Sequence, residues 1–169
     1  FQYHRFYPGN ASNMIVALDY MGLVDVAKKC LLNARCAQQP HGRMENPHAP
    51  QAHRWENNGY VLWAWSRHYR LTRDRDFLAQ VYPNVAACVA WVREKSTQDP
   101  LGLLPPVALA DDAMLAGVRQ TGQHLWILLG LKSAIRMAES MEKPGDVAAF
   151  REVDRRFRDA FDKALALQH

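Results

Sequence analysis

Apolar residues recur every three or four positions along nearly the whole of this 169-residue chain. In residues 77–92 the apolar positions are Phe77, Val81, Val85, Cys88, Val89 and Val92. This spacing gathers apolar side chains on one face of an α-helix, whereas a half-buried strand alternates apolar and polar residues. Because no segment shows a convincing alternation, the sequence predicts an all-α fold.

The expected helices are joined by connections that alternate between short and long. We expect helices near residues 11–20, 24–38, 58–71, 75–96, 120–140 and 144–167. The short connections are residues 21–25, 71–76 and 141–146, and the long, Pro-containing ones are 39–57 and 97–118. Short loops join antiparallel neighbours. The chain is therefore predicted to be one domain, residues 1–169, built as an array of three αα-hairpins with both long loops at one end.

Composition narrows the classes of function. The net charge is +4, but 21 basic and 17 acidic residues are mixed along every segment, which is not typical of a nucleic-acid-binding stripe. No stretch has the ~18 uninterrupted apolar residues of a membrane helix. Cys30, Cys36 and Cys88 show no C-x-x-C spacing, so we interpret them as small buried residues of a cytoplasmic protein. We expect neither nucleic acid nor membrane as a partner.

The segment after the first long loop resembles a known family. It begins with Trp55-Glu56-Asn57-Asn58-Gly59 and continues with a helical hairpin, a GLLP loop at 102–105 and TGQHLWILLG at 121–130. These stretches resemble the six-hairpin glycosidases, the (α/α)6-barrel glycoside hydrolases related to glucoamylases. The resemblance covers most of residues 10–165, about three hairpins. It implies half of an (α/α)6 toroid, either part of a larger barrel or a half barrel that self-associates.

Two features depart from the family pattern. Members often carry an Arg-Asp pair where this chain has Gly9 and Asn10. Their catalytic base usually lies in the last hairpins, which are not among these three. The resemblance therefore implies a domain that acts on or binds a small glycoside or oligosaccharide, with an incomplete enzyme as one alternative.

Glu56 is the first candidate catalytic residue. Glycoside hydrolysis uses two carboxyl groups, one of which donates a proton to the leaving group. An apolar neighbour such as Trp55 disfavours the carboxylate and so helps a donor to keep its proton. The alternative is that Glu56 only caps the helix that follows or opposes its dipole.

Asp111 and Asp112, in the second long loop, are candidates for the second carboxylate. Either could act opposite Glu56 or hydrogen-bond sugar hydroxyls, although adjacent residues rarely face one ligand together. The alternative is that they cap a helix around residues 113–118.

Aromatic and amide side chains are expected near the same end of the array. Aromatic faces stack on the C–H faces of sugar rings, and amides bind hydroxyl groups. The predicted substrate-binding residues are Trp55, Asn58, Tyr3, Phe6, Gln123, His124 and Trp126, with Tyr7 and Gln120 beside them. Trp63, Trp65 and Trp91 lie well inside helices and are expected in the core.

The sequence is also consistent with two other classes of function. A sugar epimerase would use histidine bases, here His124 and His53, and a non-catalytic helical module would keep the hairpins for binding or assembly. The spacing of His41, His48 and His53 matches no common zinc pattern, so we expect no metal and no cofactor.

The partner we expect besides carbohydrate is a second copy, as a homodimer, or the remainder of a longer chain. Half a toroid leaves inner helices without neighbours, so apolar residues should be uncovered at Met14, Leu18, Leu128 and Ile135.

Overall fold

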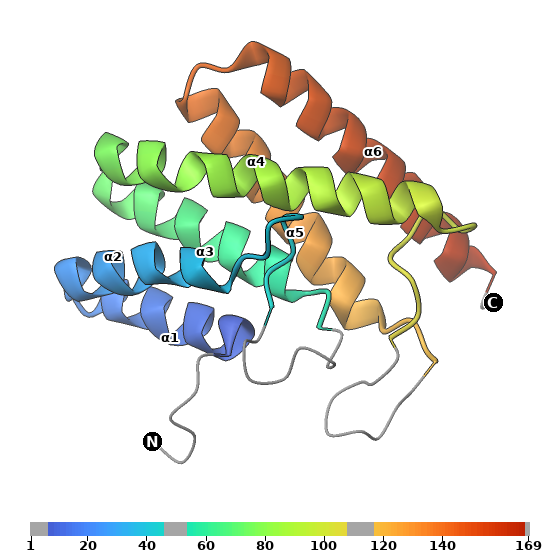
Figure 1. Ribbon diagram of the computed structural model, residues 1–169, viewed down its shortest axis with the longest axis horizontal. Helices are drawn as coiled ribbons and strands as arrows, with labels where there is room; N and C mark the ends of the chain where they lie inside the picture. The colour runs from blue at the N-terminus through green and yellow to red at the C-terminus, as the bar shows by residue number, and fades with distance from the viewer. Residues whose placement is uncertain (1–6, 46–53, 108–116, 168–169) are drawn as a thin grey trace.

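The computed structural model describes residues 7–45, 54–107 and 117–167 (Figure 1). The described residues form six α-helices and no strand, which confirms the all-α prediction. In chain order they are α1 (Pro8–Tyr20), α2 (Val24–Asn33), the short 3-10 helix η1 (Ala34–Ala37), α3 (Asn57–Thr72), α4 (Arg75–Gln98), α5 (Thr121–Ser140) and α6 (Pro144–Ala166).

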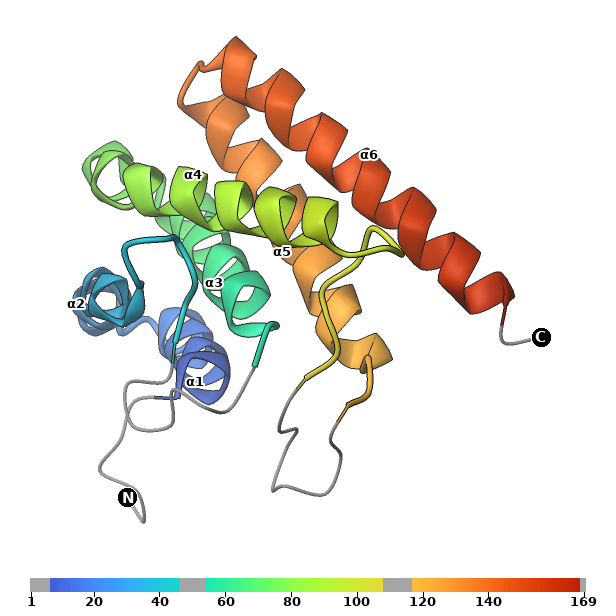
Figure 2. The ribbon, with the colours of Figure 1, turned by 45° about the vertical axis from the view of Figure 1, so that its right-hand side comes forward.

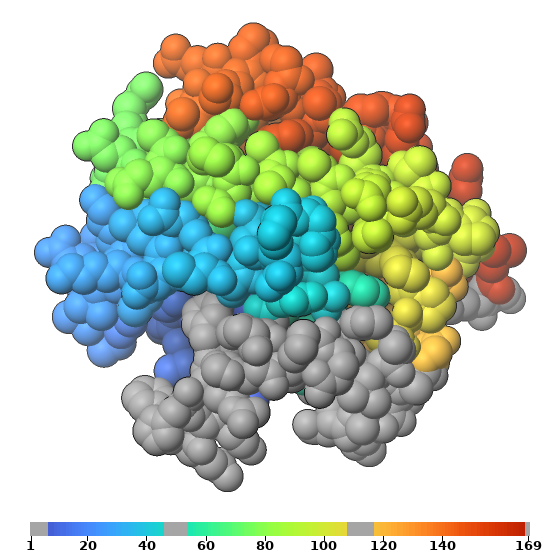
Figure 3. Space-filling view, in the orientation of Figure 1, coloured from blue at the N-terminus to red at the C-terminus, as the bar shows by residue number. Residues whose placement is uncertain are grey.

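The helices lie in two layers. Helices α1, α3 and α5 lie side by side, with α3 between the other two, and α2, α4 and α6 cover them on one side (Figures 1 and 2). The α1–α2, α3–α4 and α5–α6 pairs are antiparallel hairpins joined by short turns. Figure 3 shows α2, the segment 38–45 and α4 closing the outer side as one continuous surface.

The three hairpin turns share one backbone design. In each, a residue with a left-handed conformation follows the first helix: Gly22 (φ 78°) two residues after α1, Arg73 (φ 58°) directly after α3 and Glu142 (φ 55°) two residues after α5. The second helix begins two residues later, at Val24, Arg75 and Pro144. A left-handed residue is the common way for a helix to stop and reverse. The turns therefore give a structural register for comparing the three inner helices.

The second predicted helix is shorter than expected. It ends at Asn33 rather than at residue 38, and η1 follows. Gln38 next pairs with Met44 as an isolated antiparallel bridge, and its side-chain amide donates to the Asn84 carbonyl oxygen over 2.9 Å. The chain leaves the helix because Gln38 is held by α4 instead of by the next helical turn.

The core lies between the two layers. Trp65, Phe77 and Trp91 are fully buried there, as predicted for the two tryptophans. Trp63 is instead partly exposed, because it lies on the side of α3 that faces away from the outer layer. Met14 is exposed as expected, whereas the expectation for Leu128 is wrong: this side chain is buried in the core. Leu18 and Ile135 are half-buried.

The cysteines differ from one another in burial. Cys88 is buried as expected, Cys30 is half-buried, and Cys36 is exposed in η1, contrary to the prediction. None of the helices in the described part of the chain is long and apolar enough to span a membrane.

Candidate functional site

Glu56 immediately precedes α3. Its backbone angles are already helical (φ −61°, ψ −17°), and its side chain makes no capping hydrogen bond to the first turn of the helix. Only 13% of the side chain is exposed, and its Oε1 lies 3.9 Å from Nη1 of Arg54. The interpretation of Glu56 as a side-chain cap is therefore not supported, although a favourable interaction with the helix dipole remains.

The two asparagines after Glu56 attach the preceding loop to α3. Asn58 is fully buried: its Oδ1 accepts from the Met44 N–H over 2.8 Å, and its Nδ2 donates to the Gly42 carbonyl over 3.1 Å. Asn57 is also buried and donates to the Met44 carbonyl over 3.4 Å. The predicted role of Asn58 in substrate binding remains a prediction, but its amide is engaged with backbone in this structure.

Trp55 connects both long loops to the outer layer. Its indole N–H donates to the Pro105 carbonyl over 2.9 Å, and its ring centroid lies 5.5 Å from that of Trp91. The guanidinium of Arg43 lies 4.7 Å from the Trp55 ring centroid, within the range of a cation–π interaction. The ring is thus buried among protein groups.

A line of partly exposed residues runs along α3. Residues spaced by three or four positions share one face of a helix, and on α3 these are Glu56, Tyr60, Trp63 and Arg67. We call this line the inner face. At its far end the Arg67 guanidinium donates a hydrogen bond to the Tyr20 hydroxyl of α1 and lies over the Tyr20 ring.

Trp126 of α5 packs onto the inner face. Its ring is stacked with that of Tyr60, with centroids 3.8 Å apart and an angle of 29° between planes, and meets Trp63 edge-on at 5.7 Å. Each of the three rings keeps part of its surface exposed. Tyr60 and Glu56 are one helical turn apart, so the structure places a carboxylate and an aromatic group on the same side of α3.

The close approach of α3 and α5 depends on two glycines. A Cβ atom on Gly59 would clash with the Trp126 backbone carbonyl, and one on Gly130 would lie 2.6 Å from the Gly59 Cα atom. This contact sets the position of Trp126 against Tyr60.

His124 lies on the opposite side of α5 from Trp126. His124 is only 2% exposed, and its ring lies against Phe157 and Phe161 of α6, with centroids 5.8 and 6.0 Å away. Its Nδ1 donates to the Gln120 carbonyl over 2.9 Å. Gln123 is buried and bonds to the Gln120 side chain. The predicted group is therefore divided, with Trp126 against Tyr60 of α3 and His124 against α6.

Burial is the main influence on His124 and lowers its pKa. The positive charge of Arg119 also lowers the pKa, whereas the carbonyl groups of Gln120 and Leu104 and the negative charge of Asp99 raise it.

His124 lines a groove of about 500 Å³ where α5 begins and α6 ends. The other residues that line it are Leu101, Leu103, Val118, Arg119, Thr121, Phe161, Ala164, Leu165 and Leu167.

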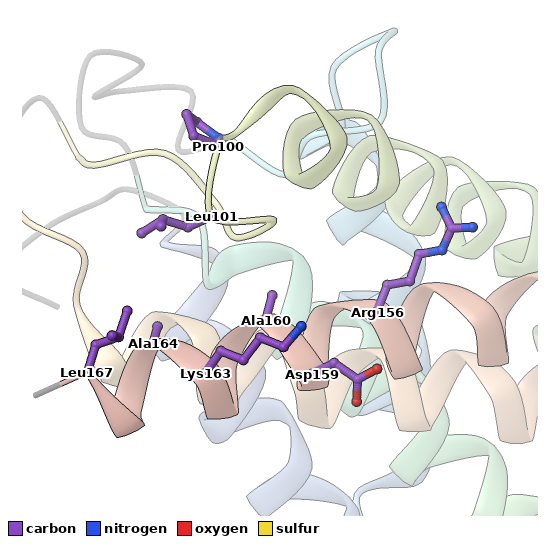
Figure 4. Close-up of a pocket in the computed structure, with 8 residues that line it drawn as sticks. All are labelled: Pro100, Leu101, Arg156, Asp159, Ala160, Lys163, Ala164 and Leu167. Carbon is purple, nitrogen blue, oxygen red and sulfur yellow. The ribbon is translucent and has the colours of Figure 1, made fainter. Parts of the chain in front are cut away.

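A neighbouring hollow of about 480 Å³ lies on the other side of the end of α6. Pro100 and Leu101 cover it from the loop after α4, and Figure 4 shows Arg156, Asp159 and Lys163 along its α6 wall. Arg156 and Asp159 are exposed and belong to a chain of ion pairs along α6. None of the predicted site residues that the structure describes lines this hollow.

Four predicted site residues lie outside the described residues: Tyr3, Phe6, Asp111 and Asp112. Among the described residues, no group of three or more His, Cys, Asp and Glu side chains is arranged to hold a metal ion.

The sequence reasoning missed a buried pair between two inner helices. His68 Nδ1 lies 2.8 Å from Asp19 Oδ1 and 3.1 Å from Oδ2, and neither side chain has any exposed surface. The His68 ring also packs edge-on against Phe77 of α4, with centroids 4.5 Å apart. A sequence feature that could have indicated this pair is the single ionisable residue, Asp19 or His68, among the apolar residues of each helix face.

Comparisons of the chain with protein-family models, with curated proteins and with solved structures find no match in any of the three.

Proposed function

We propose that this chain is a glycoside hydrolase-like domain that binds a small glycoside or oligosaccharide on the inner face. Glu56 takes the position of the proton donor, and Trp126 with Tyr60 provides the aromatic surface. One observation carries the proposal: a largely buried carboxylate that does not cap its helix lies one turn from partly exposed, stacked aromatic rings. Sites for small molecules combine such apolar surfaces with a few placed polar groups.

The presence of one placed carboxyl group favours binding over turnover. Arg54 Nη1 lies 3.9 Å from Glu56 Oε1. The carboxyl oxygens of Glu56 can accept hydrogen bonds from sugar hydroxyls. Hydrolysis also needs a second carboxyl group ~5–9.5 Å from the first, and the candidates Asp111 and Asp112 remain predictions. We therefore expect measurable sugar binding with weak or no hydrolysis.

The epimerase alternative gains no specific support. His124 is buried between Gln120 and α6, on the opposite side of α5 from Trp126, and His53 lies outside the described residues. A histidine base in an epimerase must reach the carbon-bound or hydroxyl proton of a sugar. A sugar on the inner face would not meet His124.

Binding and hydrolysis can be tested separately. Calorimetric titration with a panel of monosaccharides and oligosaccharides measures binding, and a panel of aryl glycosides measures turnover. Glu56→Gln and Trp126→Ala should each weaken binding by about tenfold or more, which corresponds to ~1.4 kcal/mol. The matched control is Glu94→Gln, because Glu94 is an exposed carboxylate on α4, in the outer layer.

Three results would contradict parts of this proposal. No heat of binding with any sugar would exclude the sugar-binding function and leave the helical-module alternative. Binding that survives both Glu56→Gln and Trp126→Ala would place the site elsewhere. Strong turnover that is lost in Asp111→Asn or Asp112→Asn would show that the second carboxylate lies in that loop and that the expectation of weak turnover is wrong.

A further inference from the structure

A groove with apolar walls and a few polar groups lies where α5 begins and α6 ends, and we call it the His124 groove. Its volume is about 500 Å³, and of the described residues that line it, Arg119, Thr121 and His124 are the polar ones. Sites for small molecules have this size and this composition. His124 lies on the opposite side of α5 from Trp126, so the groove is separate from the inner face.

The groove has a buried floor and an exposed rim. Leu103, His124 and Phe161 on the floor are 3%, 2% and 7% exposed, whereas Leu101 and Leu165 on the rim are exposed. A flat protein surface does not reach side chains that are buried to this degree, but a small molecule can enter beside them. The shape therefore favours a small ligand.

His124 brings a buried ring nitrogen that lacks a hydrogen-bond partner. Its Nδ1 is engaged with the Gln120 carbonyl, but its Nε2 makes no hydrogen bond with any group in the described part of the chain. Burial lowers the pKa of His124 and the nearby Leu104 carbonyl opposes that shift, yet this carbonyl makes no hydrogen bond to Nε2. Buried polar groups are nearly always hydrogen-bonded. A ligand in the groove can supply the missing partner, because His124 lines it.

Arg119 is held beside His124 with one nitrogen uncommitted. Its Nη2 pairs with Asp99, and its Nε donates to the Leu104 carbonyl over 3.2 Å. Its Nη1 donates to no group that the structure describes. Two of the three guanidinium nitrogens thus fix the side chain, which leaves the third for an anion.

The first turn of α5 adds the positive end of a helix dipole. The helix begins at Thr121, which lines the groove. Gln120 makes no side-chain cap, and the first turn contains no acidic residue. The unpaired N–H groups of a helix N-terminus favour a negative charge. Arg119, His124 and this helix end therefore favour an anionic group at the same end of the groove.

We propose that the His124 groove binds a small organic carboxylate with an apolar body, such as an aryl or medium-chain carboxylic acid. The carboxylate lies at the start of α5, between Arg119 Nη1 and His124, and the apolar body lies along the leucines of the wall. A doubly charged phosphate fits less well, because Asp99 already balances the charge of Arg119. A hydrocarbon would leave His124 Nε2 unpaired. The inference does not rest on the proposed binding of sugars.

The test is calorimetric titration of the folded chain with octanoate and with 4-phenylbutyrate. Octanamide is the first comparison, because it keeps the apolar body of octanoate without the charge. Acetate is the second, because it keeps the carboxylate without the body. Both carboxylate probes should bind about tenfold or more tightly than octanamide and acetate.

Charge variants at the rim separate electrostatic from apolar effects. Leu165 is 36% exposed, so substitutions there leave the core intact. Leu165→Glu puts a second negative charge beside the carboxylate and should raise the dissociation constant of octanoate about tenfold or more. Leu165→Lys loses the same apolar contact but adds an opposite charge, so it should bind octanoate more tightly than Leu165→Glu does. Leu71→Glu, on the middle hairpin and 50% exposed, is the control and should leave binding unchanged.

NMR titration of the His124 ring reports directly on the carboxylate. A neighbouring negative charge favours the imidazolium form. Bound octanoate should therefore raise the pKa of His124, whereas octanamide should leave this pKa unchanged. Arg119 and Asp99, the charged side chains that influence His124, are present in both measurements and do not account for a difference.

Four outcomes would overturn the proposal. These are no binding of either carboxylate probe, equal binding of octanoate and octanamide, equal effects of Leu165→Glu and Leu165→Lys, and an unchanged titration of His124 with octanoate bound. Trp126→Ala alters the inner face and should leave octanoate binding unchanged. Failure of sugar binding and failure of carboxylate binding are therefore distinguishable.

Discussion

Gly130 of α5 lies directly against Gly59 of α3, so that a Cβ atom on Gly130 would be only 2.6 Å from the Gly59 Cα atom. Both glycines are buried in the contact that holds Trp126 on Tyr60. Glycine inside a helix normally destabilises it by ~1 kcal/mol relative to alanine. Here the missing side chains allow the two inner helices to approach.

We expect Gly130→Ala to destabilise the protein by ~1–3 kcal/mol, because the added methyl group must push two backbones apart. The free energy of unfolding from urea denaturation measures this. Gly122→Ala is the control on the same helix, since no atom lies within 4 Å of a Cβ at Gly122. That change should be neutral or stabilise by up to ~1 kcal/mol. Equal effects of the two changes would contradict a close contact at Gly130.

The buried pair of Asp19 and His68 should be important for stability. Removing one partner leaves a buried polar or charged group without compensation, which costs ~3–5 kcal/mol. We therefore expect Asp19→Ala to lower the free energy of unfolding by about that amount. Arg155→Ala is the control, because its partner Glu152 lies on the surface of α6 and exposed pairs contribute little. A loss for Asp19→Ala as small as for Arg155→Ala would exclude a structural role for the pair.

The lowered pKa of His124 predicts a pH dependence of stability. In the unfolded chain the imidazole takes up a proton near its ordinary pKa of ~6.5, whereas burial makes the folded ring take it up less readily. The unfolded state then binds more protons, so stability is full above ~6.5 and falls as the pH drops toward the folded pKa.

His124→Gln should remove this part of the pH dependence. Between pH 7 and the folded pKa, the slope of unfolding free energy against pH should be flatter than in the wild type, by at most ~1.4 kcal/mol per pH unit. Denaturation by urea at several pH values measures the slope. The exposed His41 supplies the control, His41→Gln, which should leave the slope unchanged. An unchanged slope in His124→Gln would contradict the burial argument.

The cysteines should differ in reactivity. Burial raises the pKa of the Cys88 thiol to about 12, against the effect of a hydrogen bond from Gln38 Nε2 over 3.2 Å. The thiolate is the reactive form, so a thiol reagent should modify the exposed Cys36 rapidly in the folded protein and Cys88 only after unfolding. Mass spectrometry of peptides after timed labelling measures both rates. Cys88 labelling in Cys36→Ser should be equally slow, and rapid labelling would show that α4 opens easily.

The sequence by itself determined the helices and their pairing into hairpins. Apolar spacing depends only on residues a few positions apart, so α3, α5 and α6 begin and end within a few residues of the prediction. The short connections were recognisable for the same reason. The break after Asn33 could not be predicted, because it depends on Asn84 and the Gln38–Met44 bridge, which are distant in sequence.

The tertiary structure alone decided which candidate residues share a surface. Gln123, His124 and Trp126 are neighbours in sequence, but a helix turns by 100° per residue, so His124 meets α6 while Trp126 meets Tyr60. Asn58 was predicted to face a sugar, yet its amide holds the backbone of Gly42 and Met44. The direction in which a side chain points follows from how the helices cross, and the crossing of α3 and α5 depends on the contact between Gly59 and Gly130. Local sequence patterns do not contain that information, because the two glycines are seventy-one residues apart.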